Sequence, residues 1–287
     1  MRQKLNFWVV GGDQRQVALT RALAEDGHWV HTYALEQGVE PALTESGLSG
    51  IEEAHCVILP LPALNGECIN TPLSDRQLPF IELLDTLRPG QLLCGGMLPP
   101  ALLSQVEGRG LTAVDYFARE ELAVANAVPS SEGAIQIAME ELPITLHGAR
   151  VLVIGAGRLG KALCWQLRGL GARVTLCARK YADLAWAQVW GCDTARSDQP
   201  DSWLCGYDLV LNTVPALLLD RDVLAQLKPG CLVIDLASKP GGVDFDAARE
   251  LGVKVIWALG LPGKVAPVTA ALAIKSTLYN ILSESGA

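Results

Sequence analysis

The chain has 287 residues, which is enough for two domains because single hydrophobic cores stop growing at roughly 250–300 residues. Half of the residues are apolar and only 6% are aromatic, a composition typical of Val-, Ile- and Leu-rich sheets covered by Ala- and Leu-rich helices. The formal net charge is -8 and no run of Lys or Arg occurs, which argues against nucleic acids and membrane surfaces as partners, because both require a basic face.

The first part of the chain alternates short apolar strands with helical patterns. Strands are predicted at 5–10, 29–33, 56–59, 91–94 and 111–115, and helices at 14–25, 77–87 and 100–106. This succession predicts a parallel, doubly wound sheet of the flavodoxin-like type.

The first strand ends in the sequence Gly11-Gly12-Asp13, at the start of the first predicted helix. A third glycine is missing and Asp13 would repel a phosphate, so this turn does not predict a second nucleotide site. Arg15 follows at the helix start and is predicted to bind a carboxylate, the alternative being an ordinary surface arginine.

The segment 118–142 is rich in Ala and Glu with helical spacing, and Pro129 lies in its middle. We predict two helices that cross from the first domain into the second, with Ser130 or Ser131 as the N-cap of the later helix. The last helical pattern, 269–282, is predicted to return to the first domain.

After this segment the chain again alternates strands and helices. Further strands are predicted at 174–178, 209–213, 232–236 and 253–257, and helices at 160–170, 184–190, 221–226 and 246–251. Together with the apolar run 151–154, this is the succession of a Rossmann domain.

A glycine-rich turn follows that apolar run and opens an amphipathic helix, the context that makes the motif specific. Gly155 permits a tight turn, Gly157 lets the backbone approach a pyrophosphate, and Gly160 allows close packing of helix on strand. The helix N-terminus offers unpaired N–H groups to the phosphates. The remaining residues of this predicted cofactor-binding turn are Ala156, Arg158 and Leu159.

The end of the next strand discriminates between NAD and NADP. An NAD enzyme places Asp or Glu there to accept from the ribose 2′-OH, whereas this sequence has Arg179 and Lys180. Arg179 can bind a 2′-phosphate with two parallel hydrogen bonds, and Lys180 adds a second charge. The sequence therefore predicts NADP, with two solvated surface cations as the alternative.

Three further loops follow strands whose carboxyl ends line the ligand cleft of such a domain. The residues predicted to contact the cofactor are Asn212, Thr213, Val214, Pro215, Asp235, Ala237, Leu261 and Pro262. Two glycines after a proline suggest a backbone that approaches a ligand, so Ser238, Gly241 and Gly242 are predicted to bind substrate.

The eight cysteines contain no C-x-x-C pair and most lie in apolar runs, so we expect free, buried thiols. The four histidines show no metal-ligand spacing, and we predict no metal. No stretch approaches the ~20 apolar residues of a membrane span. Residues 1–12 lack the features of a signal peptide, so we expect a cytoplasmic protein.

Five motifs, GGDQRQ, VPSSEGAIQIAM, NTVP, DLASKPGGVDF and GLPGKVAP, occur in this order along the chain. In this respect the whole chain resembles the family of the dipicolinate synthase A subunit (the dinucleotide-binding one) and, more distantly, 2-hydroxyacid and methylene-tetrahydrofolate dehydrogenases. The resemblance implies NADP-dependent oxidation of dihydrodipicolinate to dipicolinate, a flavoprotein-like second subunit, and action in the mother cell of a spore-forming bacterium. We also expect a homo-oligomer.

The expected fold is therefore α/β, with a flavodoxin-like substrate and catalytic domain over 1–128 and a Rossmann NADP-binding domain over 129–268. The helix within 269–287 is expected to pack on the first domain. Two alternatives remain open, namely a dehydrogenase of another small carboxylate and a non-catalytic NADP-binding subunit.

A dianionic substrate approaching an acidic chain needs local cations and helix ends. The residues predicted to supply them are Arg15, Lys239, Ser130, Ser131 and Gly133. Lys239 stands where relatives carry Arg, which replaces a bidentate fork by a point charge. Glu132 is preferred over Asp13 as the proton acceptor, the alternatives being a helix-stabilising role for Glu132 and proton transfer to water or to a substrate carboxylate.

Overall fold

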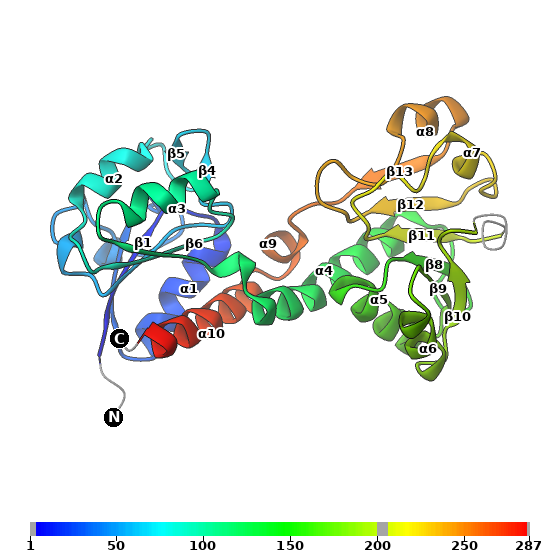
Figure 1. Cartoon of the computed structure of the whole chain (residues 1–287), viewed down its shortest axis with the longest axis horizontal. Coiled ribbons are helices and arrows are strands. Elements are labelled where there is room, and N and C mark those ends of the chain that lie inside the picture. Colours follow the sequence, from blue (N-terminus) through cyan, green and yellow to red (C-terminus); the bar gives the residue numbers. More distant parts are fainter. Residues whose placement is uncertain (1–3, 200–205, 286–287) are drawn as a thin grey trace. The chain divides into compact units, whose positions relative to one another are not determined.

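The computed structural model describes residues 4–199 and 206–285, which form two compact α/β units (Figure 1). The first unit contains Met1–Asn126 and Ala266–Ala287, and the second contains Ala127–Val265. The α/β class with two parallel, doubly wound sheets is confirmed.

The sheet of the first unit has five parallel strands in the order β2-β1-β3-β6-β7. Their bounds are Asn6–Val10 for β1, Trp29–Tyr33 for β2, Cys56–Ile58 for β3, Leu92–Gly95 for β6 and Thr112–Asp115 for β7. This is the flavodoxin-like order that the sequence predicted. A short antiparallel pair, β4 (Leu64–Asn65) and β5 (Cys68–Ile69), follows β3 and was not predicted.

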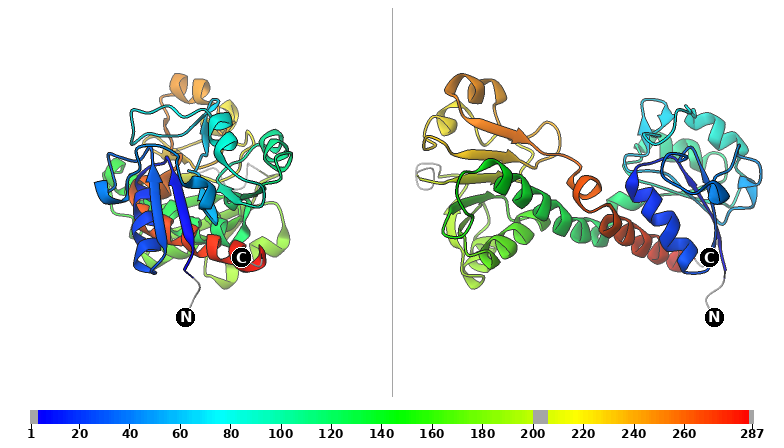
Figure 2. Two further views of the ribbon diagram at one scale, coloured as in Figure 1. Left: turned by 90° about the vertical axis from the view of Figure 1, so that its left-hand side faces the viewer. Right: turned by 180° about the vertical axis from the view of Figure 1, so that it is seen from behind.

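Helices cover both faces of this sheet, each over its own apolar core. They are α1 (Gln14–Glu25), α2 (Phe80–Thr86), α3 (Pro100–Glu107) and α10 (Pro267–Ser285), with short 3-10 turns at Pro41–Leu43, Ile51–Glu53 and Tyr116–Ala118. The C-terminal helix α10 lies alongside α1, as the views of Figure 2 show. Lys275 and Tyr279 of α10 bind the Asp26 carboxylate at the end of α1, at 2.8 and 2.6 Å.

The helix α4 (Glu120–Glu141) runs without a break through Pro129, so the predicted pair of helices is wrong. Proline removes one backbone hydrogen bond from a helix interior. Each end of the helix is nevertheless anchored by its own buried residues, Leu122 in a core of the first unit and Ala134 and Ala138 in a core of the second. Packing at both ends therefore holds the helix together, and the division between the two units falls inside it.

The second unit has the predicted Rossmann fold, and its sheet has six parallel strands in the order β10-β9-β8-β11-β12-β13. The strand bounds are Arg150–Ile154 for β8, Arg173–Ala178 for β9, Asp193–Arg196 for β10, Leu209–Asn212 for β11, Leu232–Asp235 for β12 and Lys254–Trp257 for β13. The helices are α5 (Arg158–Gly169), α6 (Tyr181–Val189), α7 (Arg221–Leu224), α8 (Phe245–Leu251) and α9 (Leu261–Val265). The sequence missed β10, whose residues DTAR are too polar to give a strand pattern.

The described cysteines are all free thiols, and only Cys68 among them is less than fully buried, while Cys205 lies outside the described residues. The described residues contain no group of His, Cys, Asp and Glu that could hold a metal ion. Within the same residues, every helix is too short or too polar to span a membrane.

Candidate dinucleotide-binding site

In the turn between β8 and α5, two of the glycines are required by the backbone conformation or by close packing within the protein. Gly155 has a φ of +102°, and a Cβ there would lie 2.3 Å from Thr213 Oγ1. A Cβ on Gly160 would lie 1.9 Å from the carbonyl oxygen of Gly155, too close for any side chain. The Gly155 N–H donates to the Cys177 carbonyl at 2.9 Å, which ties the turn to the end of β9.

Gly157 has no such internal reason to be glycine. It is the N-cap of α5 with φ -72° and ψ -169°, an extended conformation that any residue adopts. A Cβ at this position would meet nothing within 4 Å. Gly157 makes no side-chain hydrogen bond to cap α5, and the N-terminus of a helix is a place where backbone N–H groups can bind an anion. The turn thus fits a pyrophosphate that passes over Gly157.

Two buried polar side chains shape the loops that follow β11 and β12. Asp235 is completely buried and accepts hydrogen bonds from Asn212 Nδ2 at 2.8 Å, from the Ala237 N–H at 3.1 Å and from the Gly242 N–H at 2.8 Å. Asn212, also buried, donates to the Val214 carbonyl at 3.0 Å and accepts from its N–H at 3.1 Å. These two predicted cofactor-binding residues therefore act by positioning the loops.

The next residue on the β11 loop faces the glycine turn. Thr213 Oγ1 donates to the Ile154 carbonyl at 2.9 Å, directly beside Gly155. Val214 is half-buried next to the same glycine, and Pro215 is exposed. Thr213 and Val214 thus lie beside the glycine turn.

Gly241 and Gly242 were predicted to let the backbone approach a substrate, but the structure shows a different reason for them. A Cβ on Gly242 would lie 2.2 Å from Asn212 Nδ2, and one on Gly241 would lie 2.9 Å from Asp235 Oδ2. Both glycines allow the loop to close over the buried pair. Ser238 and Lys239 are exposed on the outer side of this loop, where a ligand can reach them.

The predicted cations lie after β9, where Arg179 and Lys180 are both exposed and Lys180 precedes α6. The neighbouring strand adds a third cation that the sequence missed, since Arg196 at the end of β10 pairs in register with Ala178. The Arg196 guanidinium lies 4.4 Å from the centre of the Tyr181 ring. The sequence could have pointed to Arg196 only if the polar segment DTAR had been recognised as a strand.

The residues predicted on α4 do not form an anion site, because the helix begins ten positions before Ser130. Ser131 is buried inside it and donates to the Val128 carbonyl at 2.8 Å, with Gln166 Oε1 at 2.6 Å. Gly133 packs against α9, where a Cβ would meet Leu261 at 3.1 Å. Leu261 itself is buried in the core beside Pro262, so neither Gly133 nor Leu261 is available to a ligand.

Glu132 is exposed and lines a cavity of about 690 Å³ with Trp165, Arg168 and Trp190. These residues lie beside the second half of α5, whereas the glycine turn precedes its first residue. Ten helical residues separate Arg158 from Arg168, a rise of about 15 Å. Within the Rossmann unit, Glu132 is therefore remote from the glycine turn.

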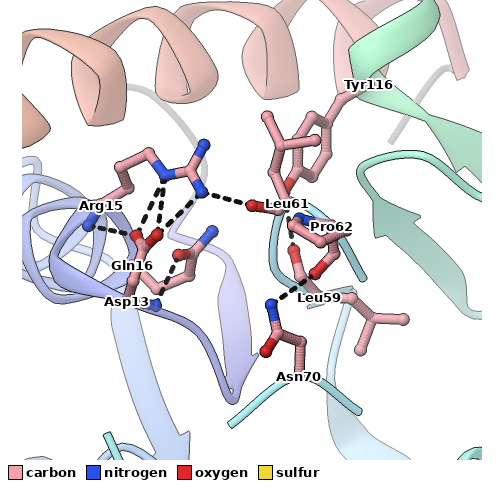
Figure 3. Close-up of polar contacts among 8 residues, drawn as sticks. All are labelled: Asp13, Arg15, Gln16, Leu59, Leu61, Pro62, Asn70 and Tyr116. Atoms are coloured by element: carbon pink, nitrogen blue, oxygen red, sulfur yellow. Dashed lines mark hydrogen bonds and ion pairs between the residues drawn. The ribbon is translucent and has the colours of Figure 1, made fainter. Parts of the chain in front are cut away.

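In the first unit, Arg15 is held by the chain itself (Figure 3). Its Nη2 donates to Asp13 Oδ2 at 2.8 Å and also to the Leu61 carbonyl, and its Nε lies 3.0 Å from Asp13 Oδ1. Asp13 caps α1, and Gln16 completes a capping box by accepting from the Asp13 N–H at 3.1 Å. The carboxylate that Arg15 binds is thus that of Asp13, and its side chain is only 10% exposed.

Two more hydrogen bonds fix the loop after β3 that Arg15 touches. Asn70 Nδ2 donates to the Pro62 carbonyl at 3.2 Å, and the buried Tyr116 hydroxyl donates to the Leu59 carbonyl at 2.9 Å. Burial raises the pKa of Tyr116 far above its usual value, so its hydroxyl stays protonated. This cluster joins the loops after β1 and β3 into one rigid edge of the sheet.

Comparison with known proteins gives matches to both units. Residues 6–117 match the family model for the N-terminal domain of the dipicolinate synthase A subunit, and residues 122–285 match "Alanine dehydrogenase/PNT, C-terminal domain". The dipicolinate synthase A subunit of Bacillus subtilis is 31% identical over 98% of this chain and 96% of its own length.

Solved structures agree with these matches. The A chain of dipicolinate synthase from Bacillus subtilis superposes with a TM-score of 0.89, covering 99% of this chain and 97% of that one. The corresponding chain of dipicolinate synthase from Bacillus halodurans, 29% identical, gives the same TM-score over 98% of this chain and 99% of its own. A transhydrogenase from Sinorhizobium meliloti, 20% identical, shares the fold with a TM-score of 0.72 over 97% of this chain and 94% of that one.

Proposed function

The chain belongs to the family of the dipicolinate synthase A subunit, and we propose that it oxidises dihydrodipicolinate to dipicolinate with NADP as the hydride acceptor. Its second half matches a dehydrogenase domain. This match supports an oxidoreductase that uses a nicotinamide dinucleotide, whatever the substrate is. The observation that carries the proposal is the glycine turn before α5 in a chain so similar to this family over nearly its whole length.

The residues that follow β9 support NADP within this proposal. The carboxylate that would accept from a ribose 2′-OH is missing after β9, where Arg179 and Lys180 stand exposed. Gly157 leaves space for the pyrophosphate that both dinucleotides share, at the N-terminus of α5. An NADP molecule laid across the turn would therefore bring its 2′-phosphate toward two cations.

The chemistry needs little from the protein besides orientation. A dihydropyridine dicarboxylate gives up one hydride and one proton and becomes an aromatic ring, which supplies much of the driving force. A bound nicotinamide would accept the hydride. Thr213 and Val214, beside Gly155, would position the ring of the cofactor, and the loop held by Asp235 would present Ser238 and Lys239 to a substrate carboxylate.

The proton requires a separate assignment. Glu132, predicted from the sequence, lies beside the second half of α5, at the other end of this helix from the glycine turn. We therefore assign the proton to water or to a carboxylate of the substrate. Lys239 remains our candidate for stabilising the substrate charge, since its side chain is exposed on the loop after β12.

The relatives are named as one subunit of dipicolinate synthase, and we propose that this chain likewise acts with a second, flavoprotein-like subunit. Assembly into a homo-oligomer and location in the mother cell of a spore-forming bacterium complete this proposal. The loop after β12 contributes the substrate contacts proposed for this chain.

The test combines nucleotide binding with turnover. Calorimetry with NADP and NAD measures binding to the purified chain, and absorbance of reduced nucleotide measures turnover of dihydrodipicolinate, with and without the second subunit. We expect preference for NADP and formation of dipicolinate. Binding of neither nucleotide would overturn the proposed function, and binding of NADP without turnover in either mixture would indicate a non-catalytic nucleotide-binding subunit.

A further inference from the structure

The strand β10, which the sequence did not reveal, ends in a charged cluster at the proposed adenosine end of the site. Arg196 Nε donates to Asp198 Oδ1 at 2.8 Å, and its Nη2 donates to Asp198 Oδ2. The positive charge of Arg179 also acts on Asp198. The Arg196–Asp198 ion pair therefore lies at the end of β10, and β9 separates this strand from β8 and the glycine turn.

The Arg196 side chain is held in place by its neighbours, but one of its nitrogens has no hydrogen-bond acceptor among the described residues. It is 22% exposed, stacks 4.4 Å from the Tyr181 ring centre, and is bridged by Asp198, whose side chain is 50% exposed. Its Nη1 is buried and has no hydrogen-bond partner within residues 4–199 and 206–285. An unpaired buried donor is costly, so such groups usually have a functional explanation.

We propose that Arg196 determines specificity for the 2′-phosphate of NADP, and that Asp198 holds the guanidinium fork until the phosphate displaces it. This inference rests on the proposed function. A guanidinium fork fits carboxylate and phosphate equally well in shape, so one can replace the other. The half-exposed carboxylate forms an ion pair that water screens, and its displacement costs little.

The exchange explains why the nucleotide must carry the phosphate. A 2′-phosphate has close to two negative charges and three acceptor oxygens, and it meets Arg196 together with Arg179 and Lys180. The ribose 2′-OH of NAD is neutral and cannot compete with Asp198 for the fork. NAD therefore binds without using the Arg196 fork, which stays on Asp198, whereas the 2′-phosphate of NADP displaces Asp198 from it.

The opposite assignment gives an opposite result. If Asp198 accepted a hydrogen bond from the ribose 2′-OH, it would play the part of the missing carboxylate after β9, and the chain would prefer NAD. Removal of its charge would then weaken NAD binding. Under our proposal the same change releases Arg196 and removes a negative charge that repels the phosphate.

The experiment measures dissociation constants by calorimetry for NADP and NAD, and for the fragments adenosine 2′,5′-bisphosphate and 5′-AMP. Arg196→Gln should weaken NADP and the bisphosphate about 10- to 30-fold and leave NAD and 5′-AMP within about twofold. Asp198→Asn should tighten NADP about 3- to 10-fold without changing NAD. Asp193→Asn and Arg173→Gln, exposed at the other ends of β10 and β9, serve as matched controls and should change nothing.

Three outcomes would overturn the inference. Weaker NAD binding by Asp198→Asn would make Asp198 the acceptor for the 2′-OH. Equal losses of both nucleotides in Arg196→Gln, with unchanged thermal unfolding, would make Arg196 a structural residue. A wild-type chain that prefers NADP while both variants bind like it refutes this inference alone, whereas a wild-type chain that binds neither nucleotide refutes the proposed function as well.

Discussion

Replacing Gly157 by alanine should weaken nucleotide binding while leaving the stability of the fold nearly unchanged. The new Cβ would meet nothing within 4 Å, and the φ of -72° and ψ of -169° are ordinary for alanine. Alanine is a poorer N-cap than glycine but restricts the unfolded chain more, and these two effects nearly cancel. We therefore expect the free energy of unfolding to change by less than about 1 kcal/mol.

Binding should suffer much more than stability. A pyrophosphate hydrogen-bonded to backbone N–H groups lies about 2.9 Å from the nitrogens, so a methyl group on the turn pushes it away. Loss of one hydrogen bond to a charged group costs about 1.5–3 kcal/mol. This corresponds to a dissociation constant for NADP that is about 10- to 150-fold higher.

Two other glycines provide the controls. Gly169→Ala at the end of α5 adds a Cβ that also meets nothing, and it should keep binding intact and raise stability by about 0.5–1 kcal/mol. Gly160→Ala forces a Cβ to 1.9 Å from the Gly155 oxygen and should lose both stability and binding. Urea unfolding and calorimetry measure the two quantities. If Gly157→Ala binds NADP like the wild type, the pyrophosphate does not cross this turn and the reasoning is refuted.

The remaining predictions concern residues that hold the two units in shape. Asp235→Asn turns one of its oxygens into a donor facing another donor, and should cost about 2 kcal/mol in urea unfolding; an unchanged midpoint would contradict the network. Hydrogen bonds from Lys275 and Tyr279 lower the pKa of Asp26. A lowered pKa stabilises the fold above the ordinary carboxyl pKa of about 3.9, and this contribution is lost as the pH falls through the lowered value. Asp26→Asn should therefore be less stable than the wild type at pH 7, with the difference shrinking below pH about 4, and a constant difference would rule out this ion pair. Arg15→Lys cannot bind both the carboxylate and the carbonyl that Arg15 binds, and should lose about 1–3 kcal/mol of stability without raising KM. A raised KM at unchanged stability would restore Arg15 as a substrate ligand.

Most of the fold could be predicted from the sequence because its strands are short apolar runs between glycine turns. The helix Gln14–Glu25 and the strand Trp29–Tyr33 have the predicted bounds, and the alternation of strands and helices predicted that both sheets are parallel and doubly wound. Local rules failed where packing outweighs them. Pro129 lies within a helix because buried residues on both sides of it pack into a core, Leu122 before the proline and Ala134 after it.

The candidate site divides in the same way. The glycine turn could be predicted, since the motif in its strand–turn–helix context determines the backbone. Arg196 could not, because its strand is too polar to recognise and its position next to Ala178 comes from sheet pairing. The ion pair of Arg15 with Asp13 had a signal that was overlooked, as Asp13 and Gln16 have the spacing of a capping box.

Electrostatics connects these observations. A chain of net charge -8 neutralises many of its arginines internally, as Arg15 is by Asp13 and Arg119 is by Glu284. In the described part of the chain, by contrast, Arg179, Lys180 and Lys239 are exposed and form no ion pair. All three follow the carboxyl ends of strands in the Rossmann sheet, where this fold binds its ligands. Local positive charge in an acidic protein raises the local concentration of anions, so a nucleotide phosphate and a dicarboxylate are both drawn to the edge where the glycine turn lies.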